Sequence, residues 1–169
     1  MEPPVPDTRT ALLHAALECF SERGFAATST RMIADRAQRP LSLLSHYFGH
    51  KEGLYLAVFT WMFESCWGDR TLPEGGHKPG SRDEAIQMLR DQIQDFCQDA
   101  FPELDPQWDF QQCSMRLFLQ EVLEPRPCLH DLMAHYLAPR TATIRNCIRM
   151  LRPDLDDGET TFLGISILG

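Results

Sequence analysis

Apolar side chains recur every three or four residues along most of this chain, and this spacing restricts its fold more than any other feature. Leu54, Val58 and Met62 illustrate the spacing, because together they keep one apolar stripe on a helix that starts near Lys51. No segment shows the alternation of apolar and polar residues that is typical of a half-buried strand. We therefore predict an all-α fold.

The first 50 residues carry the signals of three short helices. The first helix is expected at residues 8–23, with Gly24 placed as its C-terminal stop. Either Ser29 or Thr30 is expected to cap the second helix, and the third follows the Gln38-Arg39-Pro40 turn. Three short helices within about 40 residues predict a helix-turn-helix module.

The remaining residues predict longer helices that are separated by clear breaks. Glycine and proline are frequent between residues 68 and 80, which predicts a loop. Ser81 and Glu84 have the spacing of a capping box and predict the start of the next helix. Further helical patterns begin at Asp105-Pro106, near Leu129 and at Thr161, where an apolar segment resembles the opening of a helix that continues beyond Gly169.

The charge of the chain is acidic overall but basic in one short segment. The formal net charge is −8, yet the residues from Thr28 to Lys51 hold four basic side chains against one acidic side chain. A small basic face can hold phosphates, whereas an acidic body limits nonspecific adhesion to nucleic acid. This distribution is compatible with a protein that contacts DNA through a limited surface.

The six cysteines are scattered, so the sequence contains neither a zinc-knuckle spacing nor a redox pair. No apolar run approaches the roughly 20 residues of a membrane span, and residues 1–7 lack the features of a signal peptide. We expect a cytoplasmic protein that does not enter a membrane. Most of the cysteines are expected to be small core residues.

Between Thr8 and Tyr55 the chain shows small, apolar and polar residues at fixed offsets. The pattern consists of Arg9, Leu12-Leu13-His14-Ala15-Ala16, Phe20, Gly24-Phe25, Ser29-Thr30-Arg31, Ile33-Ala34, Ala37, Tyr47-Phe48-Gly49 and Lys51-Glu52-Gly53-Leu54-Tyr55. This segment resembles the DNA-binding domain of TetR-family regulators. The resemblance implies a ligand-responsive transcriptional repressor that binds a pseudo-palindromic operator in double-stranded DNA as a homodimer.

The resemblance also assigns roles to individual residues in this segment. The third helix, Leu41 to Tyr47, is expected to enter the major groove. Arg31 is the expected base reader of the second helix, because a guanidinium can bond guanine in two places. Further base contacts are assigned to Leu41, Ser42, Ser45 and His46, and phosphate contacts to Thr30, Tyr47 and Lys51. His46 and Tyr47 stand in the reverse of the family's usual order, so the assignment leaves open which of the two has which role.

The turn before the third helix departs from the family pattern. Gln38 and Arg39 occupy positions that usually hold glycine and a small aliphatic residue. A left-handed conformation at Gln38 would cost about 1–2 kcal/mol, and Arg39 is expected to lean toward phosphate. Leu44 is expected in the core, whereas Leu43 faces either the core or the groove. Because of this turn, a ligand-sensing or protein-interaction module without specific DNA binding is the alternative function.

The resemblance divides the chain into a DNA-binding domain, residues 1–50, and a helical effector-binding and dimerisation domain, residues 51–169. Residues 116–125 and 138–140 are similar to the CecR-like subgroup of the family. The expected effector is a small apolar or amphipathic molecule. Its pocket is assigned to the large side chains Trp61, Phe63, Trp67, Phe96, Phe110, Met115, Phe118 and Tyr136. The second domain is expected to be incomplete at its C-terminus.

Signals for enzymatic chemistry are missing from the sequence. It contains no glycine-rich phosphate loop, no Ser-His-Asp signature and no cluster with metal-ligand spacing. His46 and His50 stand four residues apart, but Gly49 interrupts the helix on which they would have to converge. We therefore expect a regulator without catalytic residues, metal or cofactor.

Overall fold

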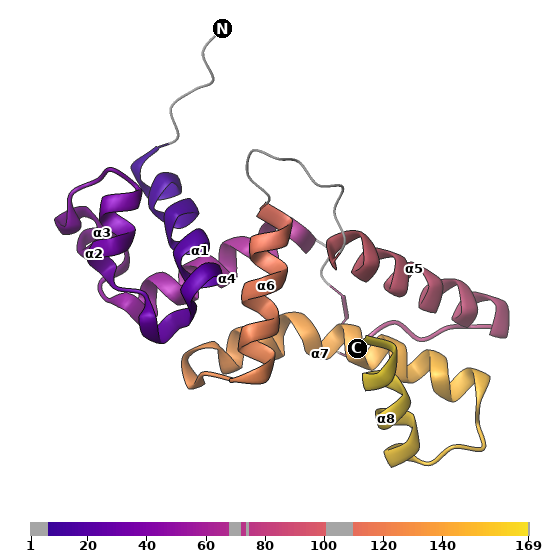
Figure 1. Ribbon diagram of the computed structural model, residues 1–169. Coiled ribbons are helices and arrows are strands. Elements are labelled where there is room, and N and C mark those ends of the chain that lie inside the picture. Colours follow the sequence, from indigo (N-terminus) through magenta and orange to yellow (C-terminus); the bar gives the residue numbers. More distant parts are fainter. Residues whose placement is uncertain (1–6, 68–71, 74, 101–109, 169) are drawn as a thin grey trace, which may run out of the picture. The chain divides into compact units, whose positions relative to one another are not determined.

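The computed structural model describes residues 7–67, 72–73, 75–100 and 110–168. In these ranges the chain is helical and contains no strand, so the prediction of an all-α fold is confirmed (Figure 1). None of the described helices is long and apolar enough to cross a membrane. The helices are α1 (Thr8–Ala27), α2 (Thr30–Arg36), α3 (Leu41–Phe48), α4 (Lys51–Trp67), α5 (Arg82–Ala100), α6 (Phe110–Leu123), the short 3-10 helix η1 (Pro127–Leu129), α7 (His130–Leu151) and α8 (Asp157–Leu168).

The chain forms two compact units. The first unit comprises residues 1–66 and 104–129, and the second comprises residues 67–103 and 130–169. In the first unit α1 packs against α2 and α6, and α2 packs against α3. In the second unit both α5 and α8 pack against α7. The functional division that the sequence predicts after residue 50 stays a prediction. In the packing, α6 belongs to the same unit as the helix-turn-helix, because it packs against α1.

Aromatic side chains of α1 and α4 fill the centre of the first unit. Phe20 and Tyr55 are fully buried, and their rings meet edge to face with centroids 4.9 Å apart. Phe59 continues this stack at 5.1 Å from Tyr55. Ala16, also fully buried, lies one turn before Phe20 on α1. Large rings beside small residues let short helices approach closely and still bury much apolar area.

The first helix begins and breaks at residues with clear local reasons. Asp7 caps α1, because its side chain accepts a hydrogen bond of 2.9 Å from the Thr10 amide. Gly24 then interrupts the helical dihedral angles with φ 75° and ψ 168°, as its predicted role as a stop requires. The regular helix thus breaks after Arg23 as predicted, and a short helical stretch follows the break and extends α1 to Ala27.

In the second unit a loop docks on α7 through a buried glycine. Asn146 donates hydrogen bonds of 3.0 Å to the carbonyls of Gly75 and His77, and Thr143 Oγ1 accepts the His77 amide at 2.9 Å. Gly76 lies between them with φ 69°, and a Cβ atom there would overlap the Thr143 backbone nitrogen. The loop predicted from residue 68 to residue 80 is confirmed in its described part.

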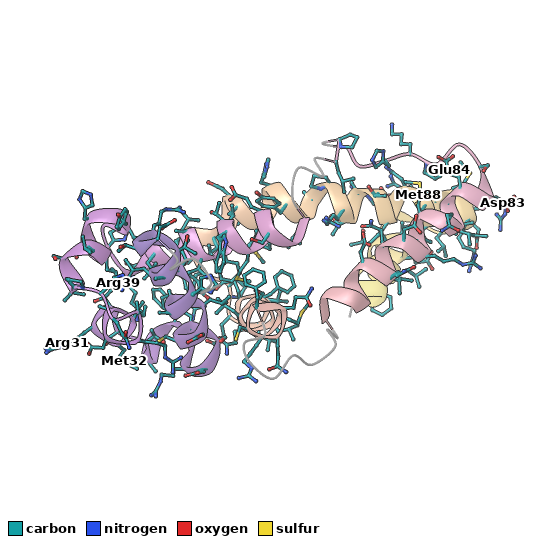
Figure 2. All side chains as sticks on the ribbon, turned by 90° about the horizontal axis from the view of Figure 1, so that it is seen from above. Arg31, Met32, Arg39, Asp83, Glu84 and Met88 are labelled. Carbon is teal, nitrogen blue, oxygen red and sulfur yellow. The ribbon has the colours of Figure 1, made fainter. Side chains whose placement is uncertain are left out.

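Side chains that bond to free backbone amides start both α5 and α8. The Glu84 amide donates to Ser81 Oγ at 3.2 Å, which confirms the predicted cap of α5, whose first turn includes Glu84 (Figure 2). Asp156 and Glu159 form a reciprocal pair of 2.8 and 3.0 Å that starts α8. The predicted start at Thr161 was therefore one turn too late. The predicted starts at Asp105-Pro106 and the residue Gly169 lie outside the described residues.

Candidate nucleic-acid interface

Hydrogen bonds of two hydroxyl side chains fix the connection between α1 and α2. The Thr28 hydroxyl donates to the carbonyls of Cys19 at 2.9 Å and Gly24 at 2.8 Å. Ser29 Oγ accepts the Met32 amide at 3.2 Å, so Ser29 and not Thr30 is the cap of α2. The broken end of α1 thus sets the direction in which α2 leaves.

This anchoring leaves one face of α2 outside. Ile33 and Ala34 are buried in the first unit, whereas Arg31 is exposed and projects outward from α2 (Figure 2). Thr30 is half-buried at the start of the helix. The predicted base reader therefore lies on the surface of the first unit.

The turn between α2 and α3 contains the backbone conformation that the sequence analysis considered for Gln38. Gln38 has φ 53°, and among the described residues it is the non-glycine residue with a positive φ. Its amide donates to the Asp35 carbonyl at 3.1 Å, and the Arg39 amide donates to the Ala34 carbonyl at 3.0 Å. These two bonds form a Schellman motif, whose left-handed position usually holds glycine. Arg39 stands half-buried at this turn, with Nη1 3.2 Å from the Gln38 carbonyl (Figure 2).

The third helix exposes most of the side chains to which DNA contacts were assigned. Leu44 is buried, as predicted, and Leu43 is half-buried. Leu41 and Tyr47 are large side chains that keep 44% and 45% of their surface exposed. The exposed side chains of α3 are Leu41, Ser42, Ser45, His46 and Tyr47. One short helix thus presents two hydroxyls, an imidazole, a phenol and an apolar group on its outer side.

Lys51, the first residue of α4, contacts the end of α1. Lys51 Nζ lies 4.3 Å from the centroid of the Phe25 ring and donates to the Ala26 carbonyl at 3.4 Å. Burial lowers the pKa of Lys51. Its predicted phosphate contact stays a prediction, and the structure adds a second task, because the same ammonium ties α4 to the end of α1.

His50 has a local structural role. Its Nδ1 atom accepts the Gly53 amide at 2.9 Å and so caps the start of α4. Gly53 is required there, because a Cβ atom would overlap the Phe48 carbonyl oxygen. His50 Nδ1 also lies 3.6 Å from Glu52 Oε2. Histidine is uncommon among helix caps, so the sequence analysis missed this role.

A second residue that the sequence analysis missed is Arg36. Its guanidinium donates two hydrogen bonds to Glu22, at 2.9 and 3.1 Å, and one to Glu18 at 3.3 Å. The bonds from Arg36 lower the pKa of Glu22, and together with the bond to Glu18 they hold α2 against α1. One of the four basic residues of the predicted patch is therefore paired within the protein.

The side chains assigned to the effector pocket fall into separate groups. In the first unit Trp61 meets Phe110 with ring centroids 4.8 Å apart, and Phe63 meets Phe118 at 6.4 Å. Met115 is half-buried on the same helix as Phe110. Tyr136 belongs to the second unit, where its ring lies 5.0 Å from that of His135. The side chains of Trp67 and Phe96 lie outside the described residues. The pocket itself stays a prediction.

The segment that forms this interface matches a known family. Residues 12–58 match the family model for bacterial regulatory proteins of the tetR family. They include all of α2 and α3, most of α1 and the first half of α4. This match identifies residues 12–58 as a segment of the tetR family type. The match confirms the predicted resemblance to TetR-family regulators, whereas the similarity to the CecR-like subgroup stays a prediction.

Curated relatives match a little more than a third of this chain. The HTH-type transcriptional regulator BetI of Burkholderia cenocepacia (strain HI2424) is 33% identical over 63 residues, which are 37% of this chain and 32% of that protein. BetI of Burkholderia mallei (strain NCTC 10229) matches to the same extent. The match thus spans about a third of the length of these relatives.

Solved structures agree with the fold over most of the chain. A HlyIIR mutant protein that carries a linker with two thrombin sites superposes with a TM-score of 0.63 and 19% identity, over 95% of this chain and 82% of that chain. Salmonella enterica GusR superposes with a TM-score of 0.56 and 19% identity, over 99% and 81%. At such identities the likeness concerns the fold alone.

Proposed function

We propose that this chain is a ligand-responsive transcriptional repressor that binds a pseudo-palindromic operator as a homodimer. The observation that carries the proposal is the outer side of α2 and α3. Arg31 projects from α2 (Figure 2), and α3 exposes Ser42, Ser45 and His46, inside the segment that matches the tetR family model. These groups can exchange hydrogen bonds with base edges and phosphates.

A dimer is proposed because one short reading helix contacts too few base pairs, and a two-fold axis doubles the contacts. Exposed apolar side chains in the second unit support it. Phe162 on α8 keeps 71% of its surface exposed, and Leu163 beside it keeps 38%. Stable homodimers commonly bury about 2,000 Å² or more of mostly apolar surface, so such side chains suit a self-association surface.

The effector is proposed to be a small, largely apolar or amphipathic molecule that binds among the aromatic side chains of α4 and α6. Trp61 and Phe110 bring two large rings together near the middle of α4. The same helix begins at Lys51, next to the reading helix. A ligand weakens DNA binding only if it prefers a conformation in which the reading helices no longer fit both half-sites.

A gel-shift titration with the DNA that flanks the chain's own gene tests the proposal. The expected result is a shifted band at nanomolar protein that survives an excess of unrelated DNA. The Arg31→Ala variant should lose about 1–3 kcal/mol of binding free energy and discriminate less at one position in each half-site. If the shift disappears with unrelated competitor, the alternative function without specific DNA binding is correct.

A further inference from the structure

A buried carboxylate lies outside the segment that matches the family model. Glu121 on α6 keeps 2% of its surface exposed and accepts three hydrogen bonds. They come from Tyr55 Oη at 3.0 Å, the Arg126 amide at 2.5 Å and Arg126 Nη1 at 2.8 Å. A buried carboxylate needs such partners, because desolvation of an unpaired charge costs several kcal/mol or more.

The arginine extends this network to the end of α1. The Arg126 guanidinium carbon lies 5.0 Å from the centroid of the Phe25 ring and 5.5 Å from that of Tyr55. The Phe25 ring is the one that Lys51 Nζ also faces, at 4.3 Å. Arg126 and Lys51 repel each other, and the Glu121 carboxylate offsets this repulsion by pairing with Arg126.

Tyr55 connects the carboxylate to the first turn of α4. It stands four residues after Lys51, so the two side chains lie on the same side of the helix. Burial and the neighbouring Glu121 raise the pKa of Tyr55, which therefore stays protonated and can donate its hydrogen bond. Glu121 thus holds α4 through its hydrogen bond with Tyr55. By pairing with Arg126 it also reduces the positive charge that acts on Lys51.

We propose that Glu121 is a positioning residue for DNA binding, which holds the Lys51 ammonium where it can reach a DNA phosphate. The inference rests on the proposed function. It extends the DNA-binding unit to residues 110–129, although the family model ends at residue 58. The attachment of α6 itself does not depend on Glu121 alone, because Gln120 Nε2 donates to the Ser21 carbonyl at 3.1 Å and α6 packs along α1.

The test measures binding of the full chain to a mixed-sequence duplex of about 30 base pairs over a range of salt concentrations. Glu121→Gln should bind about five- to tenfold more weakly than wild type near 0.1 M salt, and its salt dependence should fall toward that of Lys51→Ala. The double variant should bind like Lys51→Ala. Glu124→Gln is the matched control, because it makes the same charge change at an exposed position and should bind like wild type.

A wild-type salt dependence in Glu121→Gln overturns the proposal, and so do losses that multiply in the double variant. If Glu121→Gln lacks the helical circular dichroism of wild type, Tyr55→Phe replaces it. That variant leaves Glu121 bonded to Arg126 and should weaken binding in the same direction by about two- to threefold.

Hydrogen exchange separates this inference from the proposed function. In Glu121→Gln, amides of residues 50–58 should exchange about tenfold faster than in wild type, while those of residues 12–20 keep their rates. Unchanged exchange at residues 50–58 overturns the positioning role, whether or not DNA is bound. If wild type fails to bind the duplex but the exchange result holds, only the proposed function is wrong.

Discussion

Replacing Gln38 with glycine is expected to stabilise the first unit. Gln38 is exposed and has φ 53° in the Schellman motif that ends α2, and a side chain in this region costs about 1–2 kcal/mol. Glycine removes that cost but loses about 0.5–1 kcal/mol more conformational entropy on folding. The expected net gain in the free energy of unfolding is therefore about 0.5–1 kcal/mol. No packed side chain is lost, so nothing else offsets this gain.

Urea unfolding followed by circular dichroism measures this gain. The control is Arg39→Gly at the next position, where φ is not positive. That variant makes the unfolded chain more flexible in the same way without relieving strain, and it also loses the contacts of the half-buried Arg39 side chain, so it should lose at least about 0.5–1 kcal/mol. The reasoning fails if Gln38→Gly is no more stable than wild type, or if both glycine variants gain stability equally.

Three further predictions concern caps, close contacts and pH. His50→Ala should lower the free energy of unfolding by about 0.5–1 kcal/mol near pH 8, because the Gly53 amide loses its acceptor. His50→Asn should restore this cap. Equal stability of the two variants in urea titrations would show that His50 is not a cap. Gly76→Ala should lower the free energy of unfolding by more than about 2 kcal/mol, because φ at this position is 69° and the new Cβ would overlap the Thr143 backbone. A melting curve like that of wild type would contradict this prediction. Burial lowers the pKa of His14 below 6.5 in the folded protein. As the pH drops below 6.5, the unfolded chain binds a proton at His14 more readily than the folded protein, so the free energy of unfolding should fall. Urea titrations at several pH values should show a smaller fall in His14→Phe, and parallel curves for wild type and variant would refute this role of His14.

The helices of the first 50 residues could be predicted because their signals are local. Ser29 caps the helix that follows it, and Gly24 supplies a conformation that other residues adopt only at a cost. Even the left-handed Gln38 could be anticipated, because the turn demands that conformation whichever residue stands there. The start of α8 was predicted one turn too late, although a local signal for it exists, because Asp156 and Glu159 have capping-box spacing.

The network around Glu121 could not be predicted from the sequence. Tyr55 and Glu121 are 66 residues apart, and glutamate is usually exposed, so no local pattern indicates their hydrogen bond. The second contact of Lys51 depends equally on where the chain brings Phe25. Long-range packing decides these roles, whereas the exposed residues of α3 follow from helical periodicity once Leu44 is placed in the core.

Hydroxyl-radical footprinting on the DNA that flanks the gene tests the central claim most directly. A symmetric dimer with one reading helix in each protomer should protect two half-sites of related, inverted sequence, with centres about 10 base pairs or a multiple of that apart. Arg31→Ala should weaken the protection of both half-sites equally. A single protected site, or no protection by the full chain at concentrations that give a gel shift, would contradict the account.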